Sequence, residues 1–292
     1  MSDPRNPGPD PNPHAPATPL PANACDAHCH VFGPVAKFPY SEDRTFTPPE
    51  APKEDLRALH RLLGFERAVL VQSACHGDDH AVLLDALEAG AGRYRGVGLI
   101  RPTTPASEVK RLHEAGVRGA RLHFTPHLGP APSRAEIDAV VALIRPFGWH
   151  IALHVAGTGV ADHAELVRSL GVQVVIDHMG RIDLRDGLDS EPVRSLLRLL
   201  ESGPVWVKLS GADRIATAPP DLADSAALAR LLAAEAPERV VWGTDFPHPN
   251  THGFVPNDGD LVDLIEQIAP DPEARERLLV ANPARCFDFP AG

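Results

Sequence analysis

Residues 25–32, with the sequence CDAHCHVF, place two histidines two positions apart in a short hydrophobic run. Side chains two apart on a strand point to the same face, so His28 and His30 form a pair that can chelate an ion. Three further hydrophobic runs also end in polar residues: IALHV (151–155) supplies His154, VVIDHMGR (174–181) supplies His178, and VVWGTDFPHPN (240–250) supplies Asp245. Polar residues at the C-terminal ends of buried strands are typical of the catalytic face of a (β/α)8 barrel.

The rest of the chain supports this fold, because strand-like and helix-like segments alternate from residue 24 onward. Eight segments are short and rich in Val, Ile, Leu or Ala, and we expect strands at 24–32, 68–72, 94–100, 117–124, 150–155, 172–178, 205–210 and 240–245. Amphipathic stretches separate them, at 53–64, 79–90, 106–116, 133–148, 162–171 and 191–202. Alternating β and α elements predict a parallel sheet, and eight such units close a TIM barrel of the α/β class. An open doubly wound sheet is disfavoured, since no glycine-rich phosphate loop follows the first strand.

Length and composition bound the domain organisation. The chain has 292 residues, which suits one barrel over residues 23–292, preceded by a Pro-rich tail at 1–22 that is disordered or draped over the surface. The formal net charge of −11 makes nucleic acid an unexpected partner. No hydrophobic run is long enough for a signal peptide or a membrane span, so we expect a cytoplasmic protein with reduced cysteines. The sequence leaves open whether it forms a homo-oligomer.

The polar residues at the strand ends suggest a hydrolytic centre. Imidazoles with one carboxylate suit Zn²⁺ or a similar ion, which makes a bound water acidic enough to act as a nucleophile near neutral pH. A carboxylate beside that water can accept its proton. Three arginines follow predicted strands and can hold acidic groups of a substrate, namely Arg121, Arg181 and Arg214. Residues expected to add neutral contacts after the second and eighth strands are Gln72, Ser73, His76, His248 and Asn250.

These strand-end residues resemble the pattern of a known family. The pattern of HxH on strand 1, His on strands 5 and 6, and Asp on strand 8 resembles the amidohydrolase superfamily. More narrowly, CDAHCHVFGP, FPY, VQSACHGDD, HMGR, WGTDFPHPN and NDGDLVD resemble the 2-pyrone-4,6-dicarboxylate lactonases and their relatives, from about residue 24 to the C-terminus. The resemblance implies hydrolysis of a small anionic lactone, of the pyrone dicarboxylate or sulfomuconolactone type, in the breakdown of aromatic compounds. The three arginines match anion-contacting positions of that family.

One position departs from the lactonase pattern and bears on the cofactor. The 2-pyrone-4,6-dicarboxylate lactonases work without a metal and carry Tyr where this chain has His154, whereas metal-dependent members of the superfamily carry His there. The resemblance therefore implies an ion, expected to be zinc, held by His28, His30, His154 and Asp245. In this hypothesis Asp245 is also the general base, and His178 hydrogen-bonds the water or the developing oxyanion. A mechanism without metal is the alternative.

Two other functions remain open from the sequence. A metal-dependent non-oxidative decarboxylase of an aromatic or muconate-type acid uses nearly the same ligand set, and release of CO₂ rather than acid would identify it. A non-catalytic binding protein on the same barrel would bind such acids without turning over any lactone.

Overall fold

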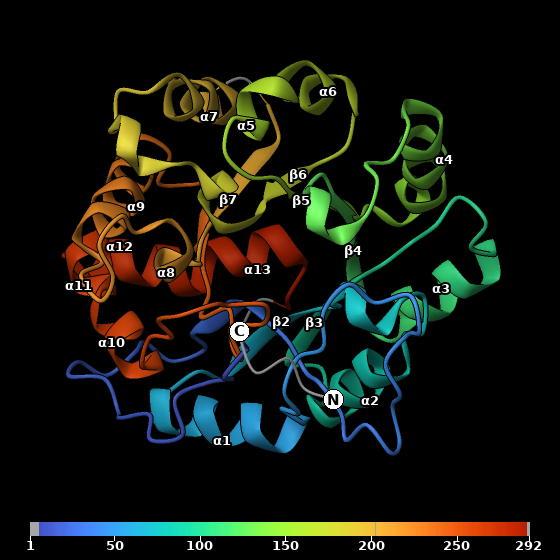
Figure 1. Cartoon of the computed structure of the whole chain (residues 1–292), viewed down its shortest axis with the longest axis horizontal. Helices are drawn as coiled ribbons and strands as arrows, with labels where there is room; N and C mark the ends of the chain where they lie inside the picture. Colours follow the sequence, from blue (N-terminus) through green and yellow to red (C-terminus); the bar gives the residue numbers. More distant parts are fainter. Residues whose placement is uncertain (1–5, 202, 291–292) are drawn as a thin grey trace.

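The computed structural model describes residues 6–201 and 203–290, and within them eight parallel strands form one sheet in the order β1 to β8 (Figure 1). The strands are β1 (Cys25–Cys29), β2 (Arg67–Val71), β3 (Tyr94–Gly98), β4 (Val117–His123), β5 (His150–His154), β6 (Val174–Ile176), β7 (Val205–Leu209) and β8 (Val240–Trp242). Each lies within a predicted segment or within one residue of it, and almost every strand residue is buried. The predicted (β/α)8 barrel is confirmed.

The barrel is nearly closed by contacts between β1 and the chain that follows β8. The Asp245 amide donates to the His28 carbonyl oxygen at 2.8 Å, and the His30 amide donates to the Phe246 carbonyl oxygen at 2.7 Å. Gly243 makes this approach possible, because a Cβ atom there would lie 2.5 Å from the His28 nitrogen. The closure therefore brings Asp245 beside the two histidines of β1.

The helices lie around the barrel, except that the last one crosses the middle of the molecule in this view (Figure 1). They are α1 (Lys53–Leu63), α2 (Ala81–Ala89), α3 (Ala106–Glu114), α4 (Arg134–Ile144), α5 (Gly159–Asp162), α6 (Ala164–Ser169), α7 (Glu191–Glu201), α8 (Ala212–Ile215), α9 (Ala223–Glu235), α10 (Asp258–Asp263), α11 (Ile265–Ile268), α12 (Pro272–Glu276) and α13 (Asn282–Phe287). Local signals set their ends: Ser133 and Glu136 form a capping box before α4, and Gly64 ends α1 at a φ of 94°. The main hydrophobic core lies between these helices and the strands.

A β-bulge in β1 decides which side chains of that strand face the centre. Asp26 pairs with Ala68 and Cys29 with Leu70, so β1 uses one residue more than β2 over this stretch. Such an extra residue reverses the in–out alternation of a strand. Ala27 accordingly packs in the inner core, and His28 also faces the barrel centre, where its ring lies 4.4 Å from that of His178.

The inner core of the barrel is filled from one end by the C-terminal segment. Phe287 and Phe289 join small inward-facing residues of the strands in one buried cluster. Arg95 donates to the carbonyl oxygen of Asp288 at 2.8 Å from Nη2 and lies over the Phe289 ring at 4.8 Å. This end of the barrel is packed, which leaves the strand C-termini as the open end.

The N-terminal segment from residue 6 runs without regular structure and contacts α10 and α11. His14 pairs with Asp260 at 2.9 Å, the Ala17 amide donates to Asp263 at 2.7 Å, and Thr18 donates to Glu266. Residues 1–5 of the predicted tail lie outside the described residues. Within the described part of the chain, no helix is both long and apolar enough to cross a bilayer.

Candidate active site

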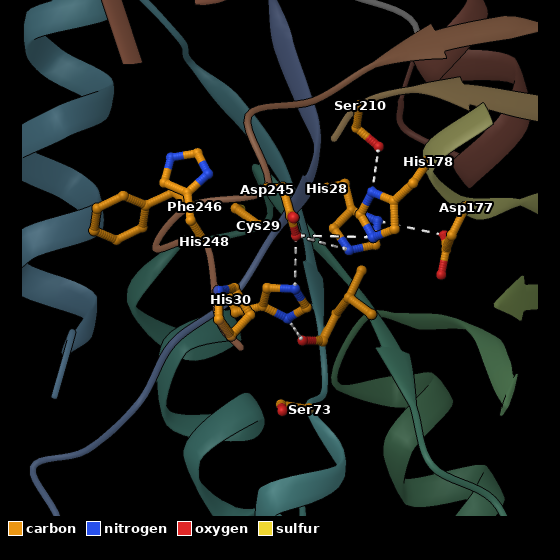
Figure 2. Close-up of polar contacts among 12 residues, drawn as sticks. His28, Cys29, His30, Ser73, Asp177, His178, Ser210, Asp245, Phe246 and His248 are labelled. Atoms are coloured by element: carbon orange, nitrogen blue, oxygen red, sulfur yellow. Dashed lines mark hydrogen bonds and ion pairs between the residues drawn. The ribbon is translucent and has the colours of Figure 1, made fainter. Parts of the chain in front are cut away.

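One carboxylate oxygen lies at the centre of the site, surrounded by imidazole nitrogens (Figure 2). Oδ1 of Asp245 lies 3.2 Å from Nε2 of His30, 3.7 Å from Nε2 of His28 and 3.9 Å from Nε2 of His178. His28, His178 and Asp245 offer ligand atoms that all lie within 4.8 Å of one another. All four side chains are buried.

The arrangement at His30 fits a bound cation. Nδ1 of His30 lies 2.6 Å from the carbonyl oxygen of Val71, so Nδ1 carries the proton and Nε2 of the neutral ring has a lone pair. That lone pair faces Oδ1 of Asp245, and two acceptors 3.2 Å apart repel each other unless a positive charge lies beside both. Two ligands bound to Zn²⁺ at about 2.0–2.1 Å are roughly 3–4 Å apart. The donor atoms of His28, His178 and Asp245 therefore fit a divalent ion, and Nε2 of His30 lies beside the same carboxylate oxygen.

The other oxygen of Asp245 is held by an arginine. Nε of Arg214 donates to Oδ2, and Nη2 of Arg214 donates to the carbonyl oxygen of Pro249 at 3.0 Å. Burial alone would raise the pKa of Asp245, but Arg214 and His178 outweigh it and hold that pKa well below its usual range. Asp245 is therefore ionised at neutral pH.

A second buried network contacts Nδ1 of His28, the ring nitrogen that does not face Asp245. Lys208 of β7 is fully buried, and its Nζ lies 3.0 Å from Nδ1 of His28 and 3.2 Å from Oδ1 of Asp177. Arg121 of β4 donates to Oδ2 of Asp177 at 3.0 Å. Burial opposes ionisation of Asp177, but Lys208, His28 and Arg121 hold its pKa well below the usual value. His178 is anchored separately, since its Nδ1 lies 3.0 Å from Oγ of Ser210.

Above this centre, at the C-terminal ends of the strands, lies a cavity that opens to solvent, and its empty space including that opening is about 410 Å³. Its polar lining includes all three predicted arginines. The lining residues are His30, Phe46, Ser73, Ala74, Arg121, His123, His127, Leu128, His154, His178, Arg181, Arg214, Asp245, Pro249 and Asn250. Burial and the neighbouring Arg214 lower the pKa of Arg181 to about 10, so the guanidinium stays charged at neutral pH. The cavity thus places an ionised carboxylate near three arginines.

His154, a predicted metal ligand, lines the cavity but lies outside the group formed by His28, His178 and Asp245. Its Nδ1 lies 3.4 Å from Nδ1 of His123, and its Nε2 has no hydrogen-bond partner within the described part of the protein. The structure therefore brings His178, rather than His154, next to Asp245. Burial, with the charge of Arg121 next in size, lowers the pKa of both His123 and His154.

Three predicted substrate contacts are engaged elsewhere and do not line the cavity. The Gln72 amide donates to the carbonyl oxygens of Gly77 and Asp79 and accepts from the Leu99 amide, so it organises the loop after β2. His76 stacks on Phe32 with a ring separation of 5.9 Å. His248, in the loop that follows β8, pairs at 3.2 Å with Asp258, the first residue of α10. Ser73 and Asn250 line the cavity.

The turns that carry the site residues have left-handed backbone. His178, Met179 and Arg181 have φ values of 53°, 52° and 45°, and Asp245 has a φ of 66°. Non-glycine residues rarely adopt this region, and such strain is concentrated at functional sites. Asp177, Lys208 and Ser210 were not predicted as site residues. A lysine inside the hydrophobic run VWVKLS was the one sequence signal for Lys208.

An eight-stranded parallel barrel with imidazoles and an ionised carboxylate at its open end is the arrangement of a TIM-barrel enzyme. Comparison with known proteins identifies the group more narrowly. Residues 25–289 match the amidohydrolase family profile, and the chain belongs to the amidohydrolase family. The resemblance inferred from the sequence motifs is confirmed.

Individual relatives agree with this assignment. The chain is 39% identical to a 2-pyrone-4,6-dicarboxylate hydrolase of Comamonas testosteroni, over 94% of this chain and 93% of the relative. It is 40% identical to a 4-sulfomuconolactone hydrolase of Hydrogenophaga intermedia, over 92% and 89% of the two chains. A crystal structure of an Agrobacterium tumefaciens protein in its apo form superposes with a TM-score of 0.84 at 31% identity, covering 95% of this chain and all of that one.

Proposed function

We propose that this protein hydrolyses a small anionic lactone of the pyrone dicarboxylate or sulfomuconolactone type. One observation carries the proposal: Asp245, ionised and flanked by three imidazoles, lies at the base of a cavity lined by Arg121, Arg181 and Arg214. A base and an anion-binding wall are together what an acidic ester substrate requires. The two hydrolases that share 39% and 40% identity with this chain are named for substrates of this kind.

The chemistry follows from the positions of the side chains. Oδ1 of Asp245 takes a proton from a water, whose oxygen attacks the lactone carbonyl carbon, while Arg214 holds Oδ2 and so fixes the direction of Oδ1. Arg181 and Arg121 hold the acidic groups of the substrate, which orients the carbonyl toward the water. The ring C–O bond then breaks, and the leaving oxygen takes up the proton that Asp245 accepted, which gives the ring-opened acid.

We propose that His28, His30, His178 and Asp245 hold a divalent ion, and zinc is the first candidate. One support is the contact between the two acceptors of His30 and Asp245, which a cation relieves. The other is the approach of Nε2 of His28 and of His178 to the same carboxylate oxygen. When bound, the ion supplies Lewis acidity to the carbonyl group and to the nearby water.

The test is turnover of purified protein with 2-pyrone-4,6-dicarboxylate, 4-sulfomuconolactone and a neutral lactone such as dihydrocoumarin. We expect acid release, followed in a pH-stat, from one or both charged lactones. The same samples are analysed for CO₂, because CO₂ release would identify a decarboxylase instead. Binding of the charged lactones without either product would identify a binding protein.

A further inference from the structure

The contact between Lys208 and His28 determines where the proton of His28 lies. An ammonium group has only donors, so Nδ1 of His28, at 3.0 Å from Nζ of Lys208, accepts its hydrogen bond. The neutral ring then carries its proton on Nε2, the atom that faces Asp245. In this tautomer Nε2 has no lone pair to offer an ion.

This tautomer leaves two buried polar atoms without hydrogen bonds. Nε2 of His28 is 3.7 Å from Oδ1 of Asp245, which is too long for a hydrogen bond. Oδ1 of Asp177 lies 3.3 Å from Nδ1 of His28 and is paired with the Lys208 ammonium at 3.2 Å, yet it accepts no well-formed hydrogen bond from any residue that the structure describes. Unpartnered buried polar atoms are costly, so a state that satisfies both is favoured once an ion is present.

We infer that Lys208 and Asp177 compete for Nδ1 of His28, and that this competition sets the affinity of the centre for a divalent ion. When Asp177 wins, Nδ1 donates to its Oδ1, and Nε2 presents a lone pair toward Asp245. Both unpartnered atoms then gain a partner in one change. Lys208 opposes this state, so it is a positioning residue that weakens ion binding.

This inference rests on the ion site of the proposed function but not on lactone turnover, so its test uses affinity. Zinc affinity of the metal-free full-length protein is measured by competition with a chromophoric chelator for the parent and for Lys208→Met. Residues supporting metal ligands commonly change affinity by roughly 10- to 100-fold. We expect Lys208→Met to bind zinc at least about tenfold more tightly. The matched control is Lys53→Met, which removes a lysine paired with Asp85 outside the barrel and should leave affinity unchanged.

Equal affinity of the parent and Lys208→Met would overturn the inference, as would absence of zinc binding in all three proteins. In either case lactone hydrolysis remains separately measurable. If Lys208→Met does not fold, Lys208→Gln takes its place.

The tautomer is read directly in the parent protein from ¹⁵N shifts of the His28 ring. We expect a proton on Nε2 without zinc and on Nδ1 with zinc. The same tautomer in both states would contradict the competition.

Discussion

Arg214 and Asp245 form an ion pair inside the barrel, with side chains only 8% and 1% exposed. The pair uses Oδ2 of the carboxylate, so Oδ1 is the oxygen that faces the imidazoles and the cavity. Arg214 therefore both keeps Asp245 ionised and fixes the orientation of its reactive oxygen. Arg214 therefore has a role within the protein, in its pair with Asp245, whereas the role proposed for Arg181 is contact with the substrate.

The first prediction concerns Asp245 as the base. Asp245→Asn should lower kcat by at least about 100-fold, because an amide cannot take a proton from water at neutral pH. The shape of the side chain is kept, so thermal unfolding should remain a single cooperative transition. Steady-state kinetics with the best charged lactone measure the effect. Activity above a tenth of the parent would remove Asp245 from this role.

The second prediction separates the two arginines. Arg181→Met should weaken kcat/KM for charged lactones, with neutral lactones barely affected, because only a substrate anion loses a partner. Arg214→Met should lower turnover of both kinds and also destabilise the fold, since breaking a buried ion pair costs about 3–5 kcal/mol. Kinetics with charged and neutral lactones, together with urea unfolding, test this. Identical profiles for the two variants would argue against the division of roles.

A third prediction follows from the buried pair of His248 and Asp258. Burial would lower the pKa of His248, but Asp258 outweighs it and raises that pKa to about 9, compared with about 6.5 for an unfolded chain. A raised pKa means that the folded state binds the proton more tightly. The contribution of the protonated His248 to the free energy of unfolding is fully present below about pH 6.5 and is lost as the pH rises toward 9. Urea unfolding from pH 6 to 9 should show this decline.

His248→Gln is the control for the pH effect, because it removes the titrating group. Its free energy of unfolding should be lower than that of the parent at pH 6, and the two should converge toward pH 9. A parallel decline in both proteins would assign the pH dependence to other groups.

The barrel was predictable because its signals are local. Each strand is a short buried run, and a helix with a readable cap or a terminal glycine follows most of them. His28, His30, His178 and Asp245 were also predictable as neighbours, since parallel strands of a barrel end on one face. Gly243 and the bulge in β1, which bring these residues into contact, were not predicted, because they depend on the approach of β1 and β8.

The remaining parts of the site depend on side-chain directions that strand order does not determine. Gln72 and His248 follow strands just as Ser73 and Asn250 do, yet their side chains turn to loop carbonyls and to Asp258. Lys208 lies in a hydrophobic run without any partner nearby in sequence. Its contacts, His28 and Asp177, come from β1 and from the turn after β6 respectively, and only the closed barrel brings the three together.

The last prediction decides which histidine holds the ion. His178 has Nε2 3.9 Å from Oδ1 of Asp245, whereas His154 pairs with His123. His178→Tyr should therefore lose most bound zinc, because a phenol is a poor replacement for imidazole. His154→Tyr, the same substitution at a cavity residue, should retain about one equivalent per chain.

Elemental analysis of protein purified without chelator measures the zinc content per chain of both variants and of the parent. Loss of zinc from His154→Tyr with retention in His178→Tyr would restore the ligand set of His28, His30, His154 and Asp245 that the motifs imply. A parent without zinc, whose activity survives chelator treatment, would favour the mechanism without metal. Activity that a chelator removes and a divalent ion restores is the result we expect, because ion and ligands must assemble before Asp245 and the water are aligned.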